Sequence, residues 1–124
     1  MIIFLTCTIL LTGCGRIQRE QSLPDLDYNL KMNLEPNPPT TGPGRLVFTL
    51  TDSADHPIDN ATLNIEGNMT HAGMVPIFAQ SSAGPSGQYS VPFEWTMSGD
   101  WTVTVQVTLA DGHRISQQFP VGVQ

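Results

Sequence analysis

The stretch QYSVPFEWTMSGDWTVTVQVTL, residues 88–109, decides the fold of this chain. Both of its halves alternate large apolar side chains with small or polar ones. The apolar positions are Tyr89, Val91, Phe93 and Trp95 in the first half, and Trp101, Val103, Val105, Val107 and Leu109 in the second. A period of two residues is that of a β-strand with one buried face. The intervening MSGD, residues 97–100, is typical of a tight turn, so the stretch predicts two strands joined by a turn.

The same alternation continues on both sides of this stretch. We expect five further strands, at residues 28–34, 45–51, 61–66, 75–79 and 115–121. Segments rich in Gly, Pro, Ser, Asn or Asp predict loops between strands at residues 35–44, 52–60, 67–73 and 81–87, and Asp111-Gly112 is a hairpin signal. Seven strands without an amphipathic helix predict an all-β fold, an immunoglobulin-like Greek-key β-sandwich of about seven strands. A closed barrel is the alternative. The expected core residues are Phe48, Leu63, Tyr89, Phe93, Trp101 and Val105.

Residues 1–13, MIIFLTCTILLTG, form an almost wholly apolar run. A helix that crosses a bilayer needs about 20 residues, so this run has the size of the hydrophobic region of an export signal. It ends in LTGC, residues 11–14, which resembles the lipobox of bacterial lipoproteins. The resemblance implies cleavage before Cys14 and attachment of lipid to its thiol, which would anchor the chain in a membrane.

Three regions follow from this reading of the N-terminus. We expect a lipoprotein signal peptide at residues 1–13, a lipidated cysteine with a polar tether at residues 14–27, and the β-sandwich at residues 28–124. No Lys or Arg precedes Arg16, so the signal lacks the positively charged start that export signals carry. The expected location is the cell envelope, at the outer membrane or the outer face of the cell membrane.

The composition excludes several classes of function. Only 13% of the 124 residues are charged, and the net charge is −6, which would repel a nucleic acid. Both cysteines, Cys7 and Cys14, precede the expected domain, so it holds no disulfide, CxxC pair or thiolate zinc site. The chain also lacks a P-loop, a GxSxG elbow and an HExxH motif. We therefore expect a module without enzymatic activity.

Methionine and histidine gather in one segment of small residues. Met69 and His71 would project to one side of an extended chain, and Gly73 would let the chain bend so that Met74 joins them. Thioether and imidazole groups form a soft ligand set that suits Cu(I), and a domain without thiols is one in which Met can replace Cys. With Met97 from the later turn, the pattern predicts a Cu(I) site. The alternative is that these methionines fill gaps at one end of the sandwich.

Three segments resemble the YtkA-like/FixH-like family of small exported domains. They are LVFTLTD with HPIDNATL (46–52 and 56–63), MTHAGM (69–74), and GQY (87–89) leading through Phe93 to MSGDW (97–101). The resemblance, which runs from about Leu46 to Leu109, implies an immunoglobulin-like sandwich without enzymatic activity. It also implies an association with copper handling or with the maturation of respiratory oxidases, and it carries the candidate ligands Met69, His71, Met74 and Met97.

Two functions are compatible with these observations. The first is a copper chaperone or buffer held at the membrane by its lipid. The second is a structural or interaction module without metal, which docks on a respiratory oxidase or another protein of the cell envelope. The two differ in whether the four candidate ligands converge at an accessible edge or scatter into the core.

Overall fold

The computed structural model describes residues 28–71, 73–82 and 85–124. The expected signal peptide at residues 1–13, the lipidated Cys14 and the tether at residues 14–27 lie outside the described residues. Within the described part of the chain, no helix has the length and apolar character needed to cross a membrane.

Seven strands form the domain, as the alternation of apolar residues predicted. They are β1 (Tyr28–Glu35), β2 (Gly42–Asp52), β3 (Thr62–Met69), β4 (Ile77–Ser82), β5 (Gln88–Trp95), β6 (Gly99–Thr108) and β7 (Arg114–Val123), with a short 3-10 turn η1 (Pro85–Gly87) before β5. The prediction of a strand–turn–strand unit in residues 88–109 is confirmed, because β5 and β6 flank the turn that carries Met97.

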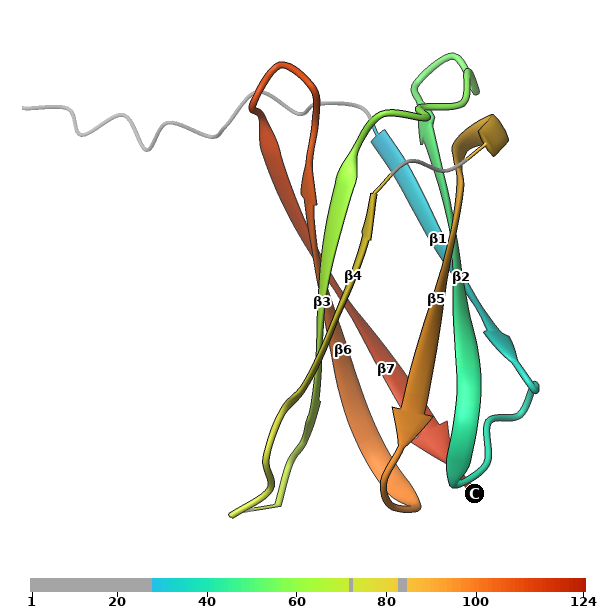
Figure 1. The fold of residues 1–124 in the computed structure, drawn as a ribbon, viewed down its shortest axis with the longest axis vertical. Helices are drawn as coiled ribbons and strands as arrows, with labels where there is room; N and C mark the ends of the chain where they lie inside the picture. The colour runs from blue at the N-terminus through green and yellow to red at the C-terminus, as the bar shows by residue number, and fades with distance from the viewer. Residues whose placement is uncertain (1–27, 72, 83–84) are drawn as a thin grey trace, which may run out of the picture.

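The strands form two antiparallel sheets that pack face to face (Figure 1). One sheet has the order β1-β2-β5 and the other has the order β4-β3-β6-β7. The chain crosses between the sheets after β2, after β4 and again after β5, which is the connectivity of a Greek-key sandwich. The expectation of an immunoglobulin-like β-sandwich is therefore confirmed, and the alternative of a closed barrel is excluded.

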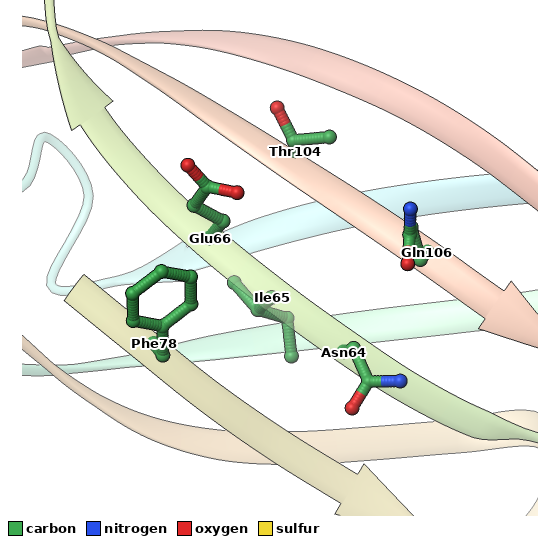
Figure 2. Close-up of a pocket in the computed structure, with 6 residues that line it drawn as sticks. All are labelled: Asn64, Ile65, Glu66, Phe78, Thr104 and Gln106. Atoms are coloured by element: carbon green, nitrogen blue, oxygen red, sulfur yellow. The ribbon is translucent and has the colours of Figure 1, made fainter. Parts of the chain in front are cut away.

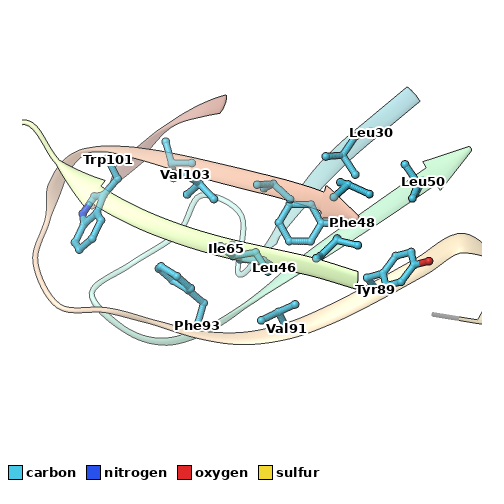
Figure 3. Close-up of a cluster of buried hydrophobic side chains, with 14 of the residues drawn as sticks. Leu30, Leu46, Phe48, Leu50, Ile65, Tyr89, Val91, Phe93, Trp101 and Val103 are labelled. Carbon is cyan, nitrogen blue, oxygen red and sulfur yellow. The ribbon is translucent and has the colours of Figure 1, made fainter. Parts of the chain in front are cut away.

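The core lies between the two sheets (Figure 3), and it contains every residue expected there. Phe48, Leu63, Tyr89, Phe93, Trp101 and Val105 are all buried. At one end of the core Trp95 lies between two other aromatic rings, with its ring centroid 4.8 Å from that of Phe93 and 5.4 Å from that of Trp101. Such tilted and edge-on pairs stabilise beyond the area that they bury.

At the other end of the core, Tyr89 joins β5 to the loop between β2 and β3. Its hydroxyl donates a hydrogen bond to the carbonyl of Ile58 at 2.6 Å and accepts one from the backbone N–H of Ala61 at 3.1 Å. Burial raises the pKa of the Tyr89 phenol. The ring thus fills the core while its hydroxyl group satisfies two backbone groups of this loop.

The prediction of a loop at residues 67–73 is wrong for residues 67–69. Strand β3 continues through Gly67 and Asn68 to Met69, and these residues pair with Val103, Thr102 and Trp101 of β6. Glycine and asparagine are poor strand formers, but pairing with a central strand overrides that preference. Gly67 also has a packing role, because a Cβ atom there would lie 2.5 Å from Cζ of Phe93.

Candidate metal site at one end of the sandwich

The topology brings the two segments that carry the candidate ligands to the same end of the sandwich. Strand β3 ends at Met69, β5 ends at Trp95, and β6 begins at Gly99, with Met69 paired to Trp101. The connection from β3 to β4 and the turn from β5 to β6 therefore leave the sandwich at the same end, at the bottom of Figure 1. His71 and Met74 lie in the first connection, and Met97 lies in the second.

Met69 is the buried member of the group. Its side chain is 9% exposed, and its methyl carbon Cε lies 2.9 Å from the point that a Cβ atom would occupy at Gly99. Gly99 has a positive φ of 127°, a conformation that favours glycine, and the absence of a side chain there leaves room for the thioether. Met69 thus packs directly beneath the turn that carries Met97.

Met97 is the exposed methionine of the same end. Its side chain is 46% exposed, and its backbone carbonyl accepts a hydrogen bond from Nε1 of Trp101 at 3.0 Å. That bond fixes the turn over the aromatic cluster. Because Met97 is two residues from Gly99, its Cα lies within about 7 Å of the Gly99 Cα. The backbone of Met97 therefore lies near the part of the turn that the Met69 side chain approaches.

The other two candidates lie in the connection between β3 and β4. His71 is exposed, whereas Met74 is half-buried and packs against the core. The expectation that Met69 and His71 project to one side is wrong, since one side chain enters the core and the other faces solvent. The extended geometry assumed for residues 69–71 ends at Met69, where a bend begins at Thr70.

The remaining histidines lie at the opposite end of the sandwich. His56 Nδ1 lies 3.3 Å from Asp52 Oδ2, and His113 Nδ1 lies 2.8 Å from Asp111 Oδ2. Neither pair belongs to a larger group of ligands, because the described residues contain no cluster of three or more His, Cys, Asp or Glu side chains placed to hold a metal. A metal site in this part of the chain would therefore depend on methionine.

The structure also shows a surface feature that sequence reasoning missed. A hollow of about 140 Å³ lies on the outer face of the four-stranded sheet, beside the exposed ring of Phe78 (Figure 2). Its lining residues are Asn64, Ile65, Glu66, Phe78, Thr104 and Gln106. The short apolar run at residues 75–79 signalled a strand, but it carried no signal that Phe78 would face solvent.

The two sheets and their connections define an immunoglobulin-like β-sandwich domain. The model of the YtkA-like family matches residues 25–106, and the chain belongs to that family. None of the curated proteins matches the chain.

Two solved structures are similar to this chain. The soluble domain of PmoD from Methylocystis sp. (Rockwell) is 15% identical over 78% of this chain and 90% of that chain, with a TM-score of 0.46. An engineered protein is 13% identical over 77% of this chain, with a TM-score of 0.49, and the match spans 20% of that protein's length.

Proposed function

We propose that this YtkA-like domain is a lipid-anchored copper-binding module of the cell envelope, without enzymatic activity. In this proposal Met97, His71, Met74 and Met69 hold Cu(I) at one end of the sandwich. The observation that carries the proposal is the close approach of the Met69 methyl group to Gly99, which begins β6 two residues after Met97. That contact joins two segments that are far apart in the sequence.

The chemistry of the four side chains supports a soft monovalent ion. Three thioethers and one imidazole are neutral donors, and they suit Cu(I) rather than Ca²⁺ or Mg²⁺, which prefer oxygen ligands. No cysteine follows Cys14, so methionine is the only soft sulfur donor in residues 28–124. The chain belongs to the YtkA-like family, and its resemblance to that family implies copper handling, which supports the same assignment.

The burial pattern suggests an order in which the ligands engage. Met97 and His71 are accessible and would capture the ion first, and the half-buried Met74 would follow. Met69 would have to turn its thioether outward, which its three rotatable side-chain bonds permit. The left-handed φ of 85° at Gly73 places a turn in the connection between His71 and Met74.

The test is a titration of the purified chain with Cu(I) against a competing chelator, without oxygen. We expect the variants His71→Ala and Met97→Leu each to weaken binding by about tenfold or more, as loss of a metal-site group does. Met32→Leu, on β1 outside the group, is the matched control and should leave the affinity unchanged. Because protonated imidazole cannot bind metal, wild-type affinity should fall in acid, and that fall should be smaller in His71→Ala.

The alternative function without metal makes the opposite prediction. If Met69 and Met74 only fill space, leucine at either position keeps the stability and no variant changes copper uptake. Affinity that is equal in wild type, His71→Ala and Met97→Leu would therefore contradict the copper proposal. The methionines would then have a packing role alone.

A further inference from the structure

Four strands form the edges of the two sheets, namely β1, β5, β4 and β7. An edge strand leaves about half of its backbone N–H and C=O groups unpaired, and it can add a further strand. Natural proteins block such edges with charged side chains or with proline, which has no N–H to donate. The four edges of this domain differ in whether they carry these residues.

Three of the edges contain blocking residues within their bounds, and β4 contains none. Strand β1 carries Lys31, β5 carries Pro92 and Glu94, and β7 carries Arg114 and Pro120. The sequence of β4, IFAQSS, is short and has neither a charge nor a proline. Among the described residues, the pairing with β3 accounts for all the backbone hydrogen bonds found for Ile77–Ser82.

Among the described residues, the two most exposed of the large apolar side chains lie on β4 and just before it. Val75 is 79% exposed and Phe78 is 71% exposed. Figure 2 shows the Phe78 ring beside Glu66 on the outer face of the sheet. A strand laid along β4 would cover part of both side chains, and the apolar area removed from water would stabilise the assembly.

We propose that β4 pairs with β4 of a second copy of this chain, antiparallel about a two-fold axis. The two four-stranded sheets would then form one continuous sheet across the dimer. An interface of this kind uses the same strand on both copies, so it needs a strand that is complementary to itself. A strand without charge meets that condition, because no like charges face each other across the axis.

One register covers both exposed apolar side chains. When Phe78 lies opposite the partner's Phe78, Ile77 lies opposite the partner's Ala79, and Val75 lies opposite the partner's Ser81. In this register odd-numbered residues pair with odd-numbered ones and even-numbered residues with even-numbered ones. Side chains on the inner face of one sheet therefore continue the inner face of the other. Directly opposed aromatic residues are among the stabilising cross-strand pairs of antiparallel sheets.

The acidic character of the chain does not prevent this pairing. The carboxylate nearest to Phe78 in the sheet is that of Glu66, its direct partner on β3. The two Glu66 residues of a dimer would be three strand spacings apart, about 14 Å. Since the Debye length is about 8 Å at physiological ionic strength, their repulsion is mostly screened, and added salt should strengthen the dimer.

Strand β4 has six residues, so the dimer should be weak and depend on concentration. The experiment is sedimentation of the full chain in detergent micelles, at concentrations up to about 1 mM, together with hydrogen exchange of the β4 amides. We expect a monomer–dimer equilibrium, and protection of β4 that increases with concentration. Phe78→Lys should weaken the dimer at least tenfold, because it places a charge on the edge.

Gln118→Lys is the matched control, because it adds the same charge to the outer face of the same sheet but on β7. It should dimerise like wild type. Association through the apolar residues 1–13 would be equal in both variants, so a loss in Phe78→Lys alone identifies β4. A monomer at every concentration would overturn the proposal, as would equal dimerisation of both variants. If hydrogen exchange of the β4 amides were also independent of concentration, a second copy would not cover this edge. A strand of another protein would then be the candidate partner of β4.

Discussion

Single residues make two close approaches possible in this sandwich. Gly67 lies in the middle of the four-stranded sheet, where the ring of Phe93 from the opposite sheet occupies the space of a side chain. Gly99 gives similar room to the thioether of Met69. In both cases the missing Cβ lets a large side chain from elsewhere in the fold fill the core. Both glycines therefore contribute through packing, and Gly99 also contributes through its positive φ.

We predict that Gly67→Ala destabilises the domain by about 1–3 kcal/mol, the usual cost of overfilling a packed core. The added methyl would lie 2.5 Å from Cζ of Phe93, so the ring or the strand must shift. Gly122→Ala is the control, because a Cβ atom there meets nothing within 4 Å. Denaturant unfolding of both variants measures the difference. Equal stability of the two would show that Phe93 can move at no cost.

At the scale of elements, side chains of aspartate hold two of the connections at the end opposite the methionines. Asp52 Oδ1 accepts hydrogen bonds from the backbone N–H groups of Ala54 and His56, each at 2.9 Å. Asp111 Oδ1 accepts one from the N–H of His113 at 3.0 Å. The backbone N–H of His56 lowers the pKa of Asp52, and that of His113 lowers the pKa of Asp111. Both carboxylates therefore stabilise the folded turns in their charged form.

The lowered pKa values predict the direction of the pH dependence. The contribution of each carboxylate is complete above the ordinary pKa of aspartate, about 3.9, and is lost as the pH falls through the lower value of the folded state. We expect wild-type stability to decline in acid, and the double variant Asp52→Asn, Asp111→Asn to decline less. Glu94→Gln on β5, an exposed carboxylate away from these turns, is the control. Urea midpoints from about pH 7 to about pH 2 provide the test, and parallel curves for all three proteins would contradict it.

At the scale of the whole molecule, the start of the first strand and the candidate metal site lie at opposite ends. Tyr28 begins β1 opposite Asp52, whereas Glu35 at the other end of β1 lies beside the start of β2. Gly42 pairs with Trp95, close to the turn that carries Met97. The tether proposed for residues 14–27 would therefore join the sandwich at the end remote from the methionines. A lipid-anchored domain of this design would present Met97 and His71 away from the attachment point.

We predict that Cys14→Ser abolishes the membrane attachment of the protein. In the proposed anchor the lipid is attached to the thiol of Cys14, and the net charge of −6 does not favour binding to anionic lipid by charge alone. Fractionation of cells and detergent phase separation measure the change, with Cys7→Ser as the control that keeps the anchor. Wild-type protein in the aqueous phase would contradict the anchor.

The alternation of apolar residues determined most of the fold. Side chains of a strand point alternately to its two faces, so a local period of two identifies both the strand and its buried side. This alternation predicts a core position for Tyr89, Phe93, Trp101 and Val105, and all four are buried. The composition of the connections determined where the strands end to within a few residues, since Pro, Gly and Asp favour turns through their own backbone and side-chain geometry.

Only the tertiary structure decided how the segments of the candidate site meet. Met69 looked like a loop residue beside Gly67 and Asn68, but pairing with Thr102 and Trp101 of β6 extended the strand and buried it. Phe78 belonged to an apolar run that fits a core strand, yet the sheet order puts β4 at an edge and its ring in water. Both outcomes depend on which strands become neighbours. That choice is made by contacts between residues far apart in the chain, and a local period carries no information about it.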